Sequence, residues 1–340
     1  MILILNPSIT PQELDALRER LESLGIGVYH AQGAERSVFT LEGDEELLRS
    51  AQLEALPGVE RVVATQKPYK LASRDYRPEK SRFRIGPGEA CAIGGKRVVV
   101  MAGPCSVESR AQCFTIGDSV AKAGASLFRG GAFKPRTSPY SFQGLGKEGL
   151  EILAEVRART GLGVITEVMD TRDVALVVEY ADVIQIGARN VQNFSLLNEV
   201  GKTRTPVFVK RGMMTTITEL LMSAEYVMAN GNEQVILCER GIRAFDPLLR
   251  NTLDLSAVPL LQSLTHLPVV VDPSHGTGDW RFVTPMALAA VAAGADGVMM
   301  EVHHEPEVAF SDGKQSLKPE KFAAAMTGMR RVARAVGRTL

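Results

Sequence analysis

The run RVVVMAG, Arg97–Gly103, is a short apolar stretch that is rich in valine and ends in a glycine. Seven runs of similar character follow it, and helix-like sequence separates them. Continuous apolar strands that alternate with helices predict a parallel sheet covered by helices. Eight such units match a (β/α)8 barrel, whereas the alternative, a doubly wound open sheet, requires no particular number of strands. The eight runs span residues 97–103, 126–130, 163–168, 182–187, 206–211, 234–240, 268–274 and 297–303.

The sequence that precedes the barrel has another pattern, in which strand-like runs enclose two helix-like runs. Thr10 offers an N-cap, with a proline at the first helical position and Glu13 at the third, and this combination predicts a helix start. The resulting order βαββαβ is the ferredoxin-like split motif. The histidine at position 30 lies on a strand without acidic or cysteine neighbours, so we expect it to be structural. The expected strands are 1–5, 27–31, 36–43 and 59–64, and the second helix is 44–56.

The chain is therefore expected to have an α/β fold in three parts. These are a ferredoxin-like domain over 1–72, a linker and barrel-capping segment over 73–95, and a catalytic barrel over 96–340. Residues 67–84 hold seven Lys or Arg against two acids. This composition favours a solvated linker, and a docking strap between the domains is the alternative.

The overall composition excludes several classes of protein. The 340 residues include 39 basic and 39 acidic side chains, and this balance argues against a general nucleic-acid or anionic-membrane binder. No apolar run reaches the roughly 18 residues of a membrane span, and the N-terminus lacks the basic start of a secretory signal. The four cysteines have neither zinc-finger spacing nor the density of a disulfide scaffold, so we expect a cytoplasmic protein.

Polar residues stand where the eight runs end, while the interiors of the runs are nearly free of charge. In a (β/α)8 barrel these ends form the rim that carries the chemistry. Many of the rim residues are cationic, and Arg and Lys suit phosphate and carboxylate ligands. So many cations would repel one another in an empty cleft, which predicts a site for at least two anionic groups. The expected cationic set is Arg129, Lys134, Arg136, Arg189, Lys210, Arg211, Arg240 and Arg243. For Arg243, a surface ion pair is a reasonable alternative.

A second set of rim residues suits a metal ion. One thiol, one imidazole and two carboxylates could surround a divalent transition metal. Taken singly, Cys105 is typical of a buried apolar cysteine, and His275 is typical of a capped histidine in a protein core. The prediction of a metal site therefore depends on the common position of the four residues at the rim. The set is Cys105, His275, Glu301 and Asp312, and His303 and His304 are competing ligands.

Several motifs resemble those of 3-deoxy-D-arabino-heptulosonate 7-phosphate (DAHP) synthases of type I-beta, in which a small ferredoxin-like domain precedes the barrel. The related 3-deoxy-manno-octulosonate 8-phosphate synthases typically carry KANRS where this chain has KPRTS, residues 134–138. The resemblance rests on AGPCSVES, RGGAFKPRTSPYSFQG, ITEVMD, QIGARNVQNFSLL, VFVKRGM, CERGIR, VDPSHGTG, and EVHHEP followed by SDGKQSL.

The resemblance implies a condensation of phosphoenolpyruvate with erythrose 4-phosphate that releases phosphate at the entry to the shikimate pathway. It implies that phosphoenolpyruvate is held by Arg129, Lys134, Arg189, Lys210 and Arg240, with Glu167 and Gln185 beside it. It implies that the sugar phosphate is reached by Lys134, Arg136 and Thr137. It implies one divalent metal ion, which could be manganese, iron, cobalt, zinc or copper, bound by Cys105, His275, Glu301 and Asp312. The expected catalytic residues are Lys134, Glu167 and His275, and the sequence leaves open whether Glu167, Lys134 or a water at the metal moves the protons.

Three rival functions fit the sequence less well. A synthase that uses arabinose 5-phosphate conflicts with Pro135-Arg136, and a class II-like aldolase usually relies on several histidine ligands, whereas the chain has five histidines. A non-catalytic sugar-phosphate sensor predicts a missing metal ligand, and none is missing. For the N-terminal domain, a stabilising or oligomerising module is one hypothesis. The resemblance favours the other, feedback control by tyrosine or phenylalanine in a homotetramer.

Overall fold

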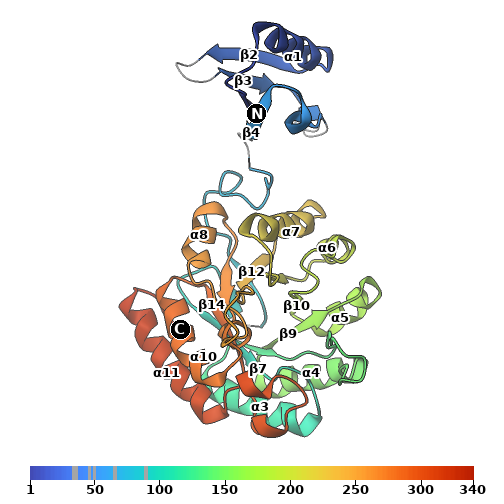
Figure 1. The fold of residues 1–340 in the computed structure, drawn as a ribbon. Helices are drawn as coiled ribbons and strands as arrows, with labels where there is room; N and C mark the ends of the chain where they lie inside the picture. The colour runs from blue at the N-terminus through green and yellow to red at the C-terminus, as the bar shows by residue number, and fades with distance from the viewer. Residues whose placement is uncertain (33–36, 45–46, 49–50, 64–66, 88–90) are drawn as a thin grey trace. The chain divides into compact units, whose positions relative to one another are not determined.

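The computed structural model describes residues 1–32, 37–44, 47–48, 51–63, 67–87 and 91–340. The chain divides into two compact units, Met1–Pro68 and Tyr69–Leu340 (Figure 1). Among the described residues, no helix is both long and apolar enough to pass through a membrane.

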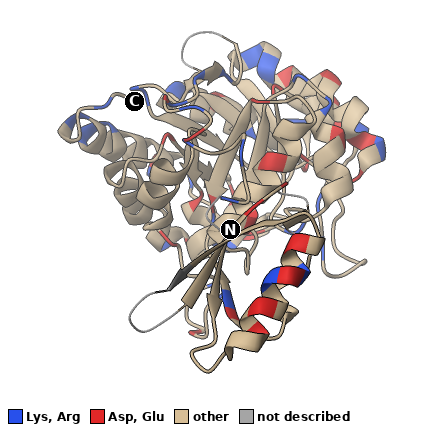
Figure 2. Ribbon diagram, turned by 90° about the horizontal axis from the view of Figure 1, so that it is seen from above, with Lys and Arg blue, Asp and Glu red and all other residues tan. Residues whose placement is uncertain are grey.

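The first unit has the expected ferredoxin-like architecture. Its antiparallel sheet has the order β2-β3-β1-β4, with β1 paired to both β3 and β4. Helix α1 begins with the expected capping box at Thr10 and Glu13, and its exposed side carries charges of both signs (Figure 2). The leucines at 3, 5, 17 and 21 form the core with Phe39. The elements are β1 Ile2–Leu5, α1 Pro11–Ser23, β2 Gly27–Gln32, β3 Ser37–Glu42, the short 3-10 helix η1 Leu53–Ala55 and β4 Val59–Val63.

The helix expected over 44–56 is only partly described. Leu47 and Leu48 are helical, whereas residues 45–46 and 49–50 lie outside the described residues. Before η1 the backbone turns at Gln52, which has a left-handed φ of 44°. That conformation interrupts a right-handed helix, so the expected helix does not run to residue 56.

The second unit is a closed barrel of eight parallel strands, which confirms the predicted fold. The strands follow one another around the barrel from β7 to β14, and β14 pairs with β7 to close it. Helices surround the strands, so each strand is buried on both faces and is mostly apolar (Figure 1). The strands are β7 Val99–Gly103, β8 Leu127–Arg129, β9 Gly163–Val168, β10 Val183–Ile186, β11 Val207–Lys210, β12 Val235–Glu239, β13 Val269–Val271 and β14 Gly297–Glu301. The helices are α3 Arg110–Ala123, α4 Lys147–Thr160, α5 Val174–Tyr180, α6 Phe194–Gly201, α7 Ile217–Ala229, α8 Ala257–Leu264, α9 Pro273–Thr277, α10 Trp280–Ala292 and α11 Pro319–Ala335.

A small hairpin closes the amino end of the barrel. Strands β5 (Phe83–Arg84) and β6 (Ala92–Ile93) pair antiparallel. Ile85, beside β5, shares one buried cluster with side chains of the barrel interior. A Cβ atom added to Gly163, the first residue of β9, would lie 3.1 Å from the Ile85 carbonyl oxygen. The hairpin therefore covers the end of the barrel opposite to the strand carboxyl ends.

The chain segment before the hairpin belongs to the barrel unit. Tyr69 and Ala72 lie in the barrel core, and the amides of Leu71 and Ala72 each donate to the Glu225 carboxylate at 2.9 Å. Lys80 pairs with the buried Asp296 at 2.6 Å. Residues 69–84 are thus docked on the barrel and are not a solvated linker, and the division at Pro68 falls before the expected boundary at residue 72.

Candidate active site and metal centre

The geometry of the strands decides which polar residues face the barrel axis. Side chains alternate between the two faces of a strand, so a residue two positions after an interior residue also points inward. Leu127, Ile165, Phe208 and Met299 all belong to the interior cluster. The polar residues two positions after interior residues are Arg129, Glu167, Gln185, Lys210, Arg240, Asp272 and Glu301.

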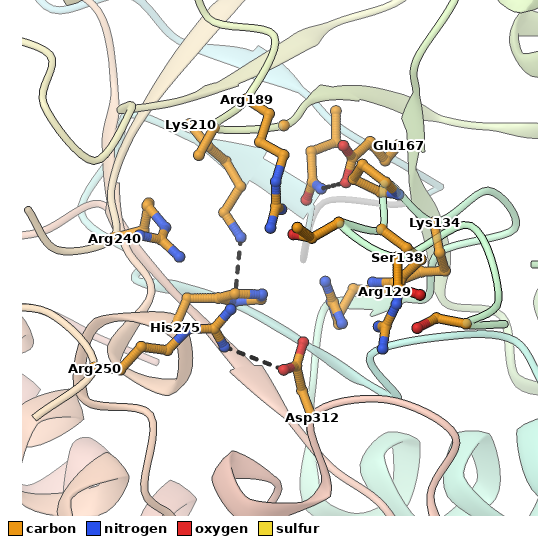
Figure 3. Close-up of a pocket in the computed structure, with 17 residues that line it drawn as sticks. Arg129, Lys134, Ser138, Glu167, Arg189, Lys210, Arg240, Arg250, His275 and Asp312 are labelled. Carbon is orange, nitrogen blue, oxygen red and sulfur yellow. Dashed lines mark hydrogen bonds and ion pairs between the residues drawn. The ribbon is translucent and has the colours of Figure 1, made fainter. Parts of the chain in front are cut away.

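A pocket of about 310 Å³ lies at this end of the barrel and is strongly cationic. Seven Lys or Arg side chains line it, against the two carboxylates of Glu167 and Asp312. Figure 3 shows Arg129, Arg189 and Lys210 directed toward a common centre. The expected substrate residues are all among the lining residues, which include Arg129, Lys134, Arg136, Thr137, Glu167, Gln185, Arg189, Lys210 and Arg240.

Two members of the expected cationic set lie outside this pocket. Arg211 follows Lys210 and therefore points away from the axis, where its guanidinium pairs with Glu239 at 2.8 Å and Asp254 at 3.0 Å. Both Arg211 and Glu239 are buried, so this pair is structural. Arg243 is also absent from the lining residues. The prediction that Arg211 belongs to the anion site is therefore wrong, whereas Arg243 is exposed and lies outside this pocket.

The four predicted metal ligands come together at one edge of the pocket. Their candidate ligand atoms all lie within 4.8 Å of one another, although the residues come from separate loops and strands. The thiol of Cys105 donates to Asp312 Oδ2 at 3.1 Å, and His275 Nε2 lies 3.5 Å from Glu301 Oε1. A thiolate, an imidazole and two carboxylates fit a divalent transition metal. The competing histidines do not join them: His303 accepts from the Glu305 amide and stacks on His304.

Asp272 orients the histidine of this cluster. Its Oδ2 accepts from His275 Nδ1 at 2.8 Å and its Oδ1 from the His275 amide at 2.9 Å. Burial raises the pKa of Asp272, but His275 and Lys210 together hold it well below its ordinary value. Burial lowers the pKa of His275, so the imidazole is neutral at pH 7. With the proton on Nδ1, the lone pair on Nε2 is free to face a metal ion.

Lys134 connects the cluster to the anion pocket. Its Nζ lies 3.0 Å from Cys105 Sγ and 3.1 Å from the Cys105 carbonyl oxygen. Burial raises the pKa of the Cys105 thiol to about 12, and Glu301 adds to the increase. Burial lowers the pKa of Lys134, but Cys105 and the surrounding acids raise it above its ordinary value, so the amine is charged.

Glu167 lies on the wall of the pocket. Its Oε2 accepts from Gln185 Nε2 at 3.1 Å, whereas its buried Oε1 has no hydrogen-bond partner among the described residues. A Cβ atom at position 187 would lie 2.0 Å from that Oε1, so Gly187 makes the space for the carboxylate. An unpartnered carboxylate oxygen beside a pocket is suited to bind a water molecule or to accept a proton.

Arg250 lines the same pocket, although it is not among the residues expected there from the sequence. Its guanidinium donates to Asp312 Oδ1 at 3.2 Å and to Gln315 Oε1 at 2.6 Å. Arg250 lies in the long loop after β12, far from any strand end, so strand position gave no signal for it. The length of that loop, residues 240–256, was the only available indication, because long loops in compact domains are usually functional.

The chain is similar to known proteins along nearly its whole length. Residues 82–335 match the DAHP synthetase I family, and residues 1–67 match the DAHP synthase ferredoxin-like domain. The chain is 46% identical over 337 residues to the phospho-2-dehydro-3-deoxyheptonate aldolase of Thermotoga maritima, with 99% of each chain covered. It is 34% identical over 250 residues to the 2-dehydro-3-deoxyphosphooctonate aldolase of Syntrophobacter fumaroxidans, a match that covers 68% of this chain and 85% of that protein.

Solved structures give the same result. The crystal structure of the Thermotoga maritima DAHP synthase matches with a TM-score of 0.94, covering 99% of this chain and 98% of that one. A truncated form of the Thermotoga maritima enzyme matches with a TM-score of 0.74 at 45% identity, covering 80% of this chain and 98% of that one.

Proposed function

The chain belongs to the DAHP synthetase I family, and we propose that its barrel joins phosphoenolpyruvate to erythrose 4-phosphate in the cationic pocket beside a bound divalent metal. The activity itself, that of a DAHP synthase at the first step of the shikimate pathway, follows from family membership and from the full-length similarity. The proposal concerns the substrates, the metal and the roles of individual residues.

One observation carries the proposal: a pocket with seven cations and two carboxylates adjoins a four-residue cluster that could hold a metal. Phosphoenolpyruvate carries a phosphate and a carboxylate, and bidentate guanidinium groups suit both. Arg129, Arg189, Lys210 and Arg240 would hold it. Arg136 and Thr137, in the loop after β8, would reach the phosphate of the sugar. Holding both substrates in one cleft supplies the orientation that a carbon–carbon bond between two molecules requires.

The residues of the pocket can support each bond change. The methylene carbon of phosphoenolpyruvate attacks the aldehyde carbon, and Lys134 Nζ donates a proton to the aldehyde oxygen. Carbon 2 becomes cationic and takes up a water, whose proton passes to the free Oε1 of Glu167. The hydroxyl of the resulting hemiketal phosphate gives its proton back to Lys134 Nζ as the carbonyl forms and the bond from carbon 2 to the phosphate oxygen breaks. Glu167 passes its proton to the departing phosphate, which leaves the keto acid, inorganic phosphate and both side chains in their starting states. A carboxylate and an ammonium group with these neighbours are suited to such proton transfers.

The metal would be held by Cys105, His275, Glu301 and Asp312. A divalent ion at this position supplies Lewis acidity, which polarises a carbonyl and stabilises developing negative charge. The donor set accepts several metals, because a soft thiolate and an imidazole are combined with two hard carboxylates.

The first experiment measures the consumption of phosphoenolpyruvate by the purified protein with erythrose 4-phosphate or with arabinose 5-phosphate. The assay is run after treatment with a chelator and again after a divalent metal is restored. We expect turnover with the four-carbon sugar only, and only with metal. Turnover with the five-carbon sugar would contradict the role assigned to the loop Lys134–Ser138, and turnover in the metal-free protein would contradict the role of the metal.

We also propose that the ferredoxin-like unit confers feedback inhibition by tyrosine or phenylalanine on a homotetramer. The support is the match of residues 1–67 to the DAHP synthase ferredoxin-like domain. A variant lacking residues 1–68 tests the proposal and leaves the barrel anchors at Leu71 and Ala72 intact. We expect this variant to retain turnover and lose inhibition. Inhibition that persists unchanged would refute the regulatory role, and sedimentation of both proteins measures the oligomeric state.

A further inference from the structure

The short helix η5, Gly313–Gln315, brings a glutamine next to a metal-ligand carboxylate. Asp312 caps this helix with a left-handed φ of 49°, and the Gln315 amide donates to the Asp312 carbonyl at 3.1 Å. Side chains three residues apart in a 3-10 helix lie on the same side of it. Gln315 is buried, while Asp312 reaches the edge of the pocket.

Arg250 joins these two side chains. Its Nη1 donates to Asp312 Oδ1 at 3.2 Å and to Gln315 Oε1 at 2.6 Å, and Figure 3 shows the first of these contacts. Arg250 comes from the loop after β12, whereas Asp312 and Gln315 come from the loop after β14. The Arg250 guanidinium therefore links the loop after β12 to the loop after β14.

Gln315 extends the contact to a second metal-ligand carboxylate. Because its Oε1 accepts from Arg250, its Nε2 must face the other way, and it donates to Glu301 Oε2 at 2.7 Å. Glu301 is completely buried, and its other oxygen, Oε1, accepts from Arg129 Nη1 at 3.0 Å, so the two hydrogen bonds together restrict its carboxylate to one orientation. Arg250 thus contacts one metal-ligand carboxylate directly and the other through the amide of Gln315.

In each carboxylate, the oxygen that this chain of contacts does not hold faces the other metal ligands. Asp312 Oδ2 lies 3.1 Å from Cys105 Sγ, and Glu301 Oε1 lies 3.5 Å from His275 Nε2. The contacts at Asp312 Oδ1 and Glu301 Oε2 therefore direct Asp312 Oδ2 and Glu301 Oε1 into the space between the four metal-ligand side chains. Hydrogen bonds of this kind around a metal site typically change metal affinity by about 10–100-fold.

We propose that Arg250 and Gln315 are positioning residues that preorganise Glu301 and Asp312 for the divalent metal. The inference rests on the proposed function, because it requires that Cys105, His275, Glu301 and Asp312 bind the ion. Neither residue needs to contact the ion or the reacting atoms.

The test is a titration of the chelator-stripped protein with Co²⁺, followed by the absorption of the thiolate–cobalt bond, and with Mn²⁺, followed by electron paramagnetic resonance. Gln315→Met keeps the length of the side chain and removes both hydrogen bonds, and Arg250→Met removes the guanidinium. We expect each substitution to weaken binding of either metal about 10–100-fold and to alter the cobalt spectrum. Arg250→Lys, which can reach one acceptor at a time, should fall between Arg250→Met and the wild type.

Lys314→Met is the matched control. Lys314 lies on the same short helix, but its nearest carboxylate is Asp279 at 3.9 Å, away from the metal ligands. We expect this variant to bind metal within about twofold of the wild type, since Lys314 is exposed and forms no ion pair with a metal ligand. In the double variant Arg250→Met/Gln315→Met, the loss should be smaller than the product of the two single losses, because the two residues act in one chain of contacts.

Three results would overturn the proposal. If wild type and Cys105→Ser bind metal alike, the metal site itself is wrong and the proposed function fails with it. If Cys105→Ser loses metal while Gln315→Met and Arg250→Met bind like wild type, the positioning role alone is wrong. If Arg250→Met raises the KM for erythrose 4-phosphate without changing metal affinity or the cobalt spectrum, Arg250 is a substrate residue instead.

Discussion

Replacing Gly187 with alanine tests the role of Glu167 without touching the carboxylate chemically. The added methyl group would lie 2.0 Å from Glu167 Oε1 and 2.6 Å from its carboxyl carbon, whereas real Cβ atoms essentially never approach a neighbour closer than 3.0 Å. The carboxylate must therefore retreat by about 1 Å, because the backbone at the end of β10 is packed in the barrel wall. A catalytic group misplaced by about 1 Å can lose about 100-fold in rate.

We expect kcat/KM for phosphoenolpyruvate to fall about 100-fold in Gly187→Ala, which corresponds to about 2.7 kcal/mol of lost transition-state stabilisation. The free energy of unfolding should fall by about 1–3 kcal/mol, the usual range for overpacking. Metal affinity should not change, since Glu167 is not in the ligand cluster. Steady-state kinetics at saturating metal, together with urea unfolding, measure these quantities.

Gly95→Ala is the control substitution, because a Cβ atom there would meet nothing within 4 Å. It should leave both kcat/KM and stability close to wild type. If Gly187→Ala folds normally and keeps kcat/KM within about threefold of wild type, the position of the Glu167 carboxylate does not matter to the reaction. The assignment of Glu167 as the proton acceptor would then be withdrawn.

Three further predictions follow from buried groups. Arg211→Met leaves the buried Glu239 without its cation and should lower the free energy of unfolding, measured in urea, by about 3–5 kcal/mol. The KM for phosphoenolpyruvate of the folded protein should stay unchanged. A raised KM would mean that Arg211 does belong to the anion site. Metal uptake at pH 7 should release about one proton from Cys105, because burial keeps its thiol protonated in the metal-free protein and a metal-bound thiol must ionise. Titration with a pH indicator measures the protons released. Equal proton release by wild type and Cys105→Ser would contradict this prediction. Burial lowers the pKa of His266 below its ordinary 6.5, so the unfolded chain binds more protons and the free energy of unfolding should decline as the pH drops below about 6.5. His266→Gln should show a weaker decline between pH 7 and pH 5.5, and equal slopes would refute the role of His266.

Much of the fold could be predicted because it repeats a simple pattern. A strand that is buried on both faces must be apolar along its length, so the eight runs from Arg97 onward were visible in the sequence, and their number indicated the closed barrel. The polar residue at each strand end marked the rim. The four metal-ligand candidates were also identified from the sequence, although only their common position at the rim and the family resemblance connected them.

The sequence could not decide which of two adjacent polar residues faces the pocket. Lys210-Arg211 and Glu239-Arg240 each place two charges at a strand end, and one member of each pair points away from the axis. The direction is set by the alternation of side chains, which depends on which residues of the strand fill the interior. In these strands only the folded barrel, with Phe208 and Cys238 inside, fixed that choice.

By itself the sequence determined the class of each element, the number of barrel strands and the chemistry gathered at the rim, because these depend on local composition and periodicity. The tertiary structure decided the contacts between distant loops: the space that Gly187 leaves for Glu167, and the contacts of Arg250 with Asp312 and Gln315. The physical reason is that residues separated by about 20 or about 60 positions become neighbours only once the strands have closed into a barrel.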